Sequence, residues 1–234
     1  MKIFGVKIEK YEKKIVLKEC LKTLVLPFKK TLFIANLNPE ILLTTKKNKD
    51  YKKIINSADI KIVDGFGLEI ISWLKKEQIG VRITGAHLSK LLIEKAKKNN
   101  LKIGIIYLED GWSSKSDLEK IFKSQKIQLL KVTKKDYLKK DYREMQNRDL
   151  VLVAIGHPRQ EILIYQKILK LKGVKIAMGI GGTLDYWTKK KKRAPQIFQK
   201  IGLEWLWRFI IQPNRILRIF NAVIKFPILA LLNK

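Results

Sequence analysis

Apolar residues occur along the chain in two patterns, and each pattern predicts a different kind of element. Short continuous apolar runs rich in Ile and Val are typical of strands whose two faces are both covered. The sequence contains six such runs, at residues 32–35, 60–63, 103–108, 127–132, 150–155 and 174–178. We therefore expect a sheet of at least six buried strands.

The segments between these runs have a helical period. In residues 88–98, Leu88, Leu91, Leu92 and Ala96 form an apolar stripe, and lysines occupy the opposite side. Residues 39–47 follow Asn38, a cap candidate, and begin with a proline, which suits the first turn of a helix. Residues 113–123 and 159–171 show similar patterns. Alternating strands and helices predict an α/β fold with a Rossmann-like, mostly parallel sheet and helices on both faces.

The charge balance narrows the class of partner. The 234 residues include 50 Lys and Arg against 21 Asp and Glu, a formal net charge of +29. Such an excess favours anionic partners, namely nucleic acid, anionic lipid head groups or phosphorylated substrates. The lysines are spread along most of the chain, which a lysine-rich proteome would also produce. Clustered arginines are more informative, because the planar guanidinium contacts phosphate with two donors.

Other features indicate a cytoplasmic protein. The single cysteine, Cys20, has no partner within the chain for a disulfide, which fits a reducing compartment. Residues 1–5 are not followed by the apolar stretch of a signal peptide. No segment approaches the roughly 20 apolar residues that span a bilayer. We expect the chain to be free in the cytoplasm or to lie on the inner face of a membrane.

The character of the chain changes after Gly182. Residues 189–193 are all basic, and Arg208, Arg215 and Arg218 then lie among aromatic and aliphatic residues. This pattern predicts an α/β core at 1–195 and an amphipathic, basic and aromatic appendage at 196–234 that associates with an anionic membrane surface. The alternative is an ordinary pair of C-terminal helices packed on the core. We favour the membrane interpretation, because nearly all charged residues of the segment are cationic.

Polar and glycine-rich loops follow the predicted strands. In open parallel sheets, ligands bind beyond the carboxyl ends of the strands. Asn36 and Asn38, residues 64–67, residues 156–161 and residues 179–182 all fall there. Glycines let backbone N–H groups approach oxygen atoms closely, which suits a nucleotide or a sugar. Neither glycine loop matches a known phosphate-binding fingerprint, so tight turns are an equal alternative.

Asp64 is the strongest candidate for a catalytic base. It stands at a strand end directly before Gly65, where a carboxylate can face a cleft. The alternative is that Asp64 caps a helix beginning near Phe66. We predict no metal site, because His87 and His157 have no Cys or paired carboxylate at ligand spacing, and we expect both histidines to serve as structural hydrogen-bonding residues. No Ser or Cys nucleophile elbow occurs.

Six motifs in a fixed order resemble those of the WecG/TagA/CpsF glycosyltransferase family over roughly residues 30–220. They are Asn-Pro-Glu at 38–40, Asp64-Gly65, Arg82-x-x-Gly85, Gly156-x-Pro158-x-Gln160-Glu161, Gly181-Gly182-x-x-Asp185 with Arg193-Ala194-Pro195, and 202–208 with Pro213, Arg215 and Arg218. The chain departs from the family pattern in four places. An expected glycine pair reads Glu109-Asp110-Gly111, a Gly-Tyr-Phe element near residue 135 is not evident, and two single positions differ. Asn36 stands where the family usually has Thr, and His87 stands where it often has Asp.

The resemblance implies a cofactor-free, metal-independent and inverting glycosyltransferase. It would move a sugar, with N-acetylmannosamine as the preferred choice, from a UDP-sugar to a polyprenyl-diphosphate-linked N-acetylglucosamine in teichoic acid or other surface polysaccharide synthesis. By resemblance, Asp64 is the base. Donor-binding residues would be Asn36, Asn38, Arg82, Gln160, Gly181, Gly182 and Asp185. The acceptor diphosphate, or the departing UDP, would be bound by Arg208, Arg215 and Arg218.

Two other classes of function compete with this hypothesis. The net charge of +29 would also suit a nucleic-acid-binding protein, but the chain has no helix-turn-helix, zinc or RNA-binding signature, so we expect no specific nucleic acid. A non-catalytic peripheral membrane protein with the same fold would not need Asp64, which is present. The donor sugar, the pathway and self-association of the chain are left open by the sequence.

Overall fold

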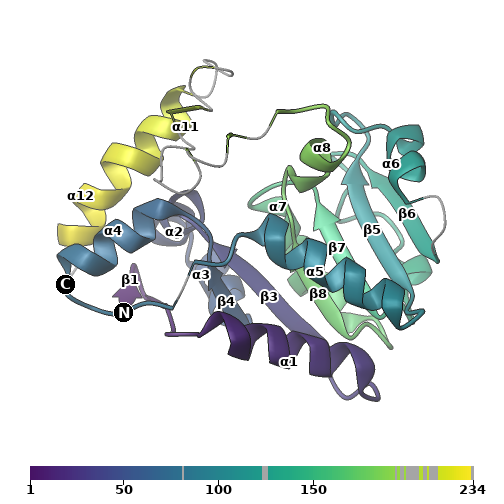
Figure 1. Ribbon diagram of the computed structural model, residues 1–234. Coiled ribbons are helices and arrows are strands. Elements are labelled where there is room, and N and C mark those ends of the chain that lie inside the picture. The colour runs from purple at the N-terminus through teal and green to yellow at the C-terminus, as the bar shows by residue number, and fades with distance from the viewer. Residues whose placement is uncertain are drawn as a thin grey trace.

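The computed structural model describes residues 1–80, 82–122, 126–192, 194–195, 198, 206–207, 210 and 216–232. Its centre is a six-stranded sheet in the order β4-β3-β8-β7-β5-β6 (Figure 1). Every neighbouring pair in this sheet is parallel. The strands are β3 (Leu32–Leu37), β4 (Ile60–Val63), β5 (Ile103–Leu108), β6 (Ile127–Val132), β7 (Leu150–Ala154) and β8 (Ile176–Gly179).

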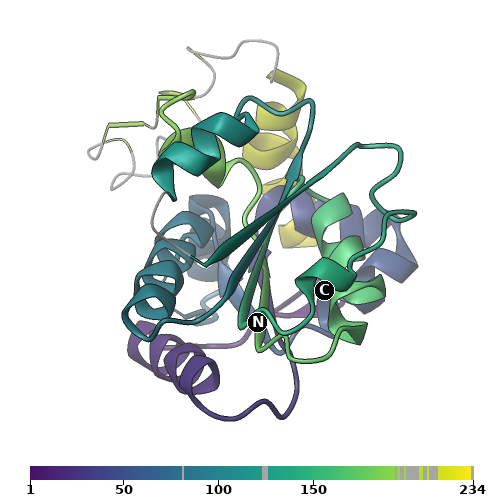
Figure 2. The same ribbon diagram turned by 90° about the vertical axis from the view of Figure 1, so that its right-hand side faces the viewer.

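Helices cover both faces of the sheet, as Figure 2 shows. Along β3, Phe33 and Ala35 belong to one apolar core and Ile34 to the other, because successive side chains of a strand point to opposite faces. One core is closed by α2 (Pro39–Lys47), α3 (Lys49–Asn56), α4 (Phe66–Leu74) and α7 (Arg159–Gln166). The other core is closed by α1 (Lys13–Val25), α5 (Gly85–Lys98), α6 (Lys115–Ile121) and α8 (Thr183–Trp187). The predicted fold class is confirmed.

Several element bounds agree with the sequence pattern. The strands at 60–63, 103–108 and 127–132 coincide with prediction, as does the helix at 39–47. The Asn38 side chain accepts a hydrogen bond from the Ile41 N–H at 3.0 Å, so Asn38 is the predicted cap of α2. The helix predicted at 113–123 begins at Lys115, because Ser114 and Asp117 form a capping box. The helix predicted at 159–171 ends at Gln166 and is followed by the 3-10 helix η2 (Ile168–Lys170).

Several elements lie outside the residue ranges that we assigned from the sequence pattern. The N-terminal residues form a small antiparallel pair, β1 (Lys2–Ile3) and β2 (Val6–Lys7), which covers the end of one core. Helices α1 and α3 were also not predicted, and α4 was expected only as a helix beginning near Phe66. A short 3-10 helix, η1 (Arg143–Met145), precedes β7 and buries Met145. These additions extend the covering of both faces and leave the topology of the sheet unchanged.

The described C-terminal residues form consecutive helical segments that pack on the core. They are α11 (Ile216–Phe220), the π-helix η4 (Asn221–Lys225) and α12 (Phe226–Leu232). Figure 1 shows α12 beside α4, and residues of the two helices are in contact. Phe226 and Ala230 are fully buried, and the Phe226 ring meets the Phe4 ring edge-on at a centroid distance of 6.2 Å. Within the described part of the chain, no helix is long and apolar enough to cross a membrane.

Phe226 should therefore be a principal anchor of the C-terminal helix. We expect Phe226→Ala to lower the free energy of unfolding by about 3 kcal/mol, because it removes a buried ring and leaves a cavity. The measurement is urea unfolding followed by circular dichroism. Leu232→Ala is the matched control, since Leu232 is 75% exposed on the same helix, and its midpoint should not change. Equal midpoints for both variants would show that α12 is not docked in solution.

Candidate active site

The polar residues predicted from the strand ends meet where β3, β4 and β8 finish. The Asn36 Nδ2 donates a hydrogen bond of 2.8 Å to the Gly179 carbonyl, so this amide links the ends of the neighbouring strands β3 and β8. Asp64 follows β4 directly, and its N–H donates to the Leu37 carbonyl at 2.7 Å. The carboxyl edge of the sheet thus holds Asn36 and Asp64 side by side, in the position where open parallel sheets bind ligands.

The Asp64 carboxylate is held by the start of α5. Its Oδ2 accepts a hydrogen bond of 2.8 Å from the Gly85 N–H, the first residue of that helix. The N-terminal end of a helix carries partial positive charge and favours a carboxylate. The alternative role, capping of α4, is wrong, because the cap residue of α4 is Gly65 and no side chain bonds to it. Asp64 is half-buried at this edge of the sheet.

Gly85 makes this arrangement possible because it has no side chain. A Cβ at this position would stand 2.1 Å from the Asn36 Nδ2 and 3.3 Å from the Asp64 Oδ2. Asn36 is 8% exposed, and among the described residues its Oδ1 has no hydrogen-bond partner. A buried amide oxygen without a partner costs free energy. The site therefore contains a fixed acceptor that a hydroxyl or amide N–H of a ligand would satisfy.

Gln160 holds the late glycine loop against the sheet. Its Oε1 accepts a hydrogen bond of 2.9 Å from the Gly181 N–H, and its Nε2 donates to the Glu161 Oε1 at 2.6 Å. Gly181 has a φ of +52°, a conformation that glycine adopts without strain. A Cβ on Gly179 would approach the Gln160 Nε2 to 2.7 Å. The side-chain amide is thus bonded within the protein, and it shapes the loop that carries Gly181 and Gly182.

A buried polar network stands behind Gln160. The Tyr51 hydroxyl donates to the Glu161 Oε2 at 3.0 Å and lies 3.0 Å from the His157 Nδ1. The His157 Nε2 lies 3.0 Å from the Thr44 hydroxyl oxygen. Burial, and then the negative charge of Glu161, raise the pKa of Tyr51, so the hydroxyl stays protonated. The hydrogen-bonding role expected for His157 is confirmed.

This network is the part of the site that sequence reasoning missed. Tyr51 lies in α3 and Thr44 in α2, whereas Glu161 lies in α7, and nothing in the residue pattern brings the three together. Glu161 is almost fully buried, which is rare for a carboxylate unless it is hydrogen-bonded. The adjacent Gln160-Glu161 pair at the start of a helix that faces the core was the signal available.

Asp185 joins the loop after β5 to the segment after α8. Its Oδ1 accepts a hydrogen bond of 3.0 Å from the Ser113 hydroxyl, and its Oδ2 lies 3.1 Å from the Lys191 ammonium nitrogen. The same ammonium lies 4.9 Å from the centre of the Trp112 ring, which is 66% exposed. Sequence reasoning selected Asp185 and missed the contributions of Trp112 and Lys191.

Two of the predicted arginines, Arg82 and Arg218, are paired with carboxylates. The Arg82 Nη1 lies 3.6 Å from the Glu69 Oε2 on α4. The Arg218 guanidinium makes a two-pronged contact with Glu40, in which Nε donates to Oε1 at 3.2 Å and Nη2 donates to Oε2. Glu40 lies in the first turn of α2, two residues after Asn38. Arg208 and Arg215 lie outside the described residues.

The described residues include no group of three or more His, Cys, Asp or Glu side chains placed to hold a metal ion. His87 lies in α5, whereas His157 lies in the loop after β7. The chemistry that the described side chains offer is a half-buried carboxylate, an acceptor amide oxygen and cations at the rim. That set suits proton transfer from a hydroxyl group beside a bound anion.

Fold and site together define an α/β enzyme with an open parallel sheet and a carboxylate-centred site at the carboxyl ends of its strands. The chain belongs to the Glycosyl transferase WecG/TagA/CpsF family, whose family model matches residues 1–234. It is therefore a glycosyltransferase. One relative is the N-acetylglucosaminyldiphosphoundecaprenol N-acetyl-beta-D-mannosaminyltransferase of Bacillus spizizenii. The two are 31% identical over 202 residues, which cover 83% of this chain and 77% of the relative.

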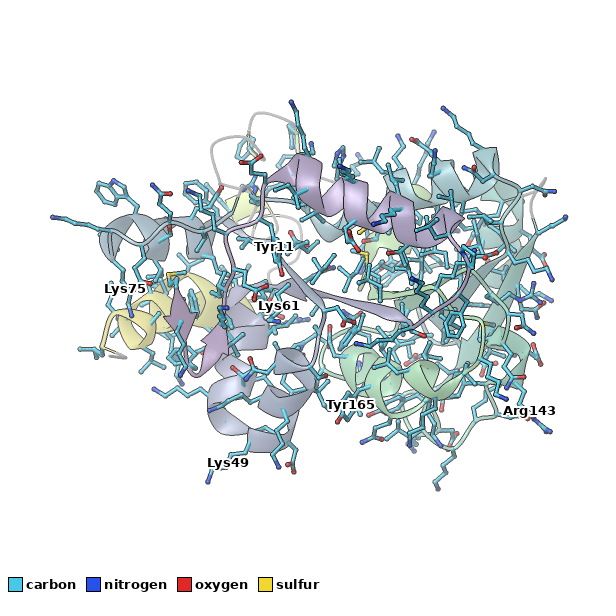
Figure 3. All side chains as sticks on the ribbon, turned by 90° about the horizontal axis from the view of Figure 1, so that it is seen from below. Tyr11, Lys49, Lys61, Lys75, Arg143 and Tyr165 are labelled. Atoms are coloured by element: carbon cyan, nitrogen blue, oxygen red, sulfur yellow. The ribbon has the colours of Figure 1, made fainter. Side chains whose placement is uncertain are left out.

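The buried network should contribute measurably to stability. We expect Tyr51→Phe to lower the free energy of unfolding by about 1–3 kcal/mol, because it leaves the buried Glu161 without its hydroxyl donor. Chemical denaturation measures this difference. Tyr165→Phe is the matched control. Tyr165 is exposed on the outside of the molecule (Figure 3), so this variant should unfold like the wild type. A Tyr51→Phe protein as stable as the control would contradict the network.

Substitutions of Gly85 and Asn36 should have coupled effects on the free energy of unfolding. Gly85→Ala should destabilise the wild type but not a variant that already carries Asn36→Ala. We expect Gly85→Ala alone to cost about 1 kcal/mol, because the new methyl group displaces the Asn36 amide from Gly179. In an Asn36→Ala background the same substitution should be neutral or stabilising, since alanine is the better helix residue and the steric conflict is gone. A double-mutant cycle of unfolding free energies measures the coupling. If the two substitutions change the free energy of unfolding additively, a side chain at residue 85 does not compete with Asn36 for the same space.

Proposed function

We propose that this glycosyltransferase moves N-acetylmannosamine from a UDP-sugar to a polyprenyl-diphosphate-linked N-acetylglucosamine, with inversion and without a metal ion. The observation that carries the proposal is the Asp64 carboxylate at the strand ends, fixed by Gly85 beside the unpartnered Asn36 oxygen. The printed name of the Bacillus relative supports the choice of sugar and acceptor. The function belongs to surface polysaccharide synthesis of the teichoic acid type.

The proposed reaction is a single displacement. The acceptor hydroxyl oxygen attacks the anomeric carbon from the face opposite the UDP, and Asp64 takes the proton of that hydroxyl. The bond between the anomeric carbon and the diphosphate oxygen breaks, and its electron pair leaves with UDP. The half-buried position of Asp64 at the start of α5, where its Oδ2 accepts a hydrogen bond from the Gly85 N–H, suits this role.

The donor would lie across the ends of β3 and β8. In the proposal, Asn36 and Asn38 contact the sugar, and Arg82 lines the same space. Asn36 offers its buried oxygen to a hydroxyl or to the N–H of an acetamido group. The nucleotide part would lie over Gly181, Gly182 and Asp185, on the loop that Gln160 holds in place. Gln160 would then act mainly by positioning the backbone of this loop.

The acceptor diphosphate would be bound by Arg208, Arg215 and Arg218. Arg218 supports this role by its position, because it reaches the first turn of α2 beside Asn38. Binding would exchange the Glu40 carboxylate for a phosphate oxygen, which accepts the same two-pronged contact from a guanidinium. A charged partner of this kind keeps the arginine in place until the substrate arrives.

We further propose that residues 1–195 form the catalytic core and residues 196–234 the membrane-associating appendage. The described part of that segment supports this division, because its helical residues combine a buried anchor with an exposed apolar side. An enzyme whose acceptor is lipid-linked would then act as a peripheral protein on the inner face of the cell membrane.

The test is acceptor-dependent release of UDP from UDP-N-acetylmannosamine, with a soluble lipid-diphosphate-N-acetylglucosamine analogue. Asp64→Asn keeps the size of the side chain and removes the base, so turnover should fall by about 10²–10⁴-fold. Asp50→Asn, a change at an exposed carboxylate of α3, is the matched control and should leave turnover unchanged. EDTA should have no effect.

Each other outcome of this assay has a distinct meaning. Release from a different UDP-sugar alone would keep the enzyme class and change the donor. Equal turnover by Asp64→Asn and the wild type would remove Asp64 as the base. An absence of release from every donor, together with an absence of UDP binding, would overturn the proposed reaction.

A further inference from the structure

The outer side of α4 exposes large apolar residues. Phe66, Ile70, Trp73 and Leu74 are all exposed, and their spacing places them along one side of the helix. Trp73 is the most exposed of the four, at 78%. Leu68 and Ile71, on the other side of the helix, are fully buried. Helix α4 is therefore fixed to the core by one face and presents an apolar face without a partner among the described residues.

The C-terminal helix repeats this arrangement next to α4. Phe226 and Ala230 hold it on the core, and Gly67 of α4 lies against it, since a Cβ there would be 3.9 Å from the Phe226 ring. Its outer side exposes Ile216, Leu217, Phe220, Ile224, Ile228, Leu231 and Leu232. We call the exposed apolar residues of α4 and of residues 216–232 the apolar platform. Figure 1 shows its two helices side by side.

The charges around the platform are mainly positive. Residues 216–232 contain no Asp or Glu, and Lys225 is exposed between the apolar positions. Lys76 is exposed just after the end of α4, and the exposed Glu77 that follows it lies 3.4 Å from the N-terminal ammonium. Figure 3 shows Lys75 at the same end of the molecule as the C-terminal helix. The one acidic residue of α4, Glu69, lies 3.6 Å from Arg82. A cationic apolar surface with an exposed tryptophan is typical of helices that lie in the head-group region of anionic membranes.

We propose that the apolar platform is a lipid-docking surface in which α4 acts together with the C-terminal helix and Trp73 is the interfacial anchor. The occupant is an anionic bilayer. Charge complementarity favours it over a second copy of this chain, because a like-charged copy would bring Lys76 and Lys225 against each other, and lysine is depleted from protein–protein interfaces. This inference extends membrane contact from the C-terminal segment to a helix of the catalytic core.

The position of α4 gives this docking a consequence for catalysis. Helix α4 begins two residues after Asp64, and Trp73 is the eighth residue of the helix. At 1.5 Å per residue, Trp73 lies about 10–14 Å along the chain direction from the catalytic end. A bilayer that covers Trp73 would therefore lie close to Asp64. A sugar carried on a membrane-anchored diphosphate would enter the site along α4, a step that rests on the proposed function.

The experiment measures binding of the full chain to vesicles of phosphatidylcholine with and without phosphatidylglycerol, by flotation. The wild type should float with the anionic vesicles, and Trp73→Ala should bind them about tenfold more weakly, because the ring no longer leaves water. Trp112→Ala removes the exposed tryptophan of the loop after β5 and is the matched control, with binding equal to the wild type. Circular dichroism of each variant establishes that it is folded.

Three results would overturn the proposal: equal binding by Trp73→Ala and the wild type, no binding of the wild type to anionic vesicles, or an oligomer in light scattering that Trp73→Ala dissolves. The choice of acceptor distinguishes a failure of this docking proposal from a failure of the proposed function. With a water-soluble acceptor, Trp73→Ala should turn over like the wild type, and with acceptor embedded in vesicles it should lose activity. If the wild type turns over neither acceptor, the proposed function fails, while flotation still decides the docking surface.

Discussion

The hydrogen bond between the Asn36 amide and the Gly179 carbonyl ties two neighbouring strands together at the edge where the candidate site lies. The Asn36 amide packs so closely against residue 85 that only glycine fits there, because a Cβ would stand 2.1 Å from the Asn36 Nδ2. The same glycine N–H then holds the Asp64 carboxylate. The positions of the proposed base and of the unpartnered acceptor oxygen therefore depend on one close approach of three residues from β3, the end of β4 and α5.

The rigidity of this edge comes from a second layer of buried polar groups. Glu161 accepts hydrogen bonds from Gln160 and Tyr51, and His157 extends the network to Thr44 in α2. Inside a protein such bonds are strong when every group has a partner, and costly when one is lost. The network thus fixes Gln160, and Gln160 fixes the loop of Gly181. The loop that we propose to bind the nucleotide would then not need to be ordered by its ligand.

The C-terminal helix connects the apolar platform with the candidate site. Its inner face reaches Phe4 and Gly67, and Arg218 near its start is paired with Glu40 beside Asn38. Because α4 starts two residues after Asp64 and Arg218 is paired with Glu40, both elements of the apolar platform are attached to residues of the proposed catalytic edge. Docking on lipid and binding of a lipid-linked acceptor would then act on the same few turns of helix. The family membership defines the enzyme as a glycosyltransferase, and this geometry supplies a reason for the basic and apolar C-terminal sequence.

The sequence by itself determined the α/β class, most strand positions, the cap at Asn38 and the strand ends that carry Asn36 and Asp64, because these follow from local periodicity and capping chemistry. It did not reveal α1, although Val16, Cys20 and Leu24 recur every four residues, because the lysines between them obscure the stripe. Only the tertiary structure decided that Asp64 bonds to Gly85 instead of capping α4, and that Tyr51, His157 and Glu161 form one network. Those contacts join residues up to 110 positions apart. Packing of whole helices on the sheet brings such residues together, and no local pattern records it.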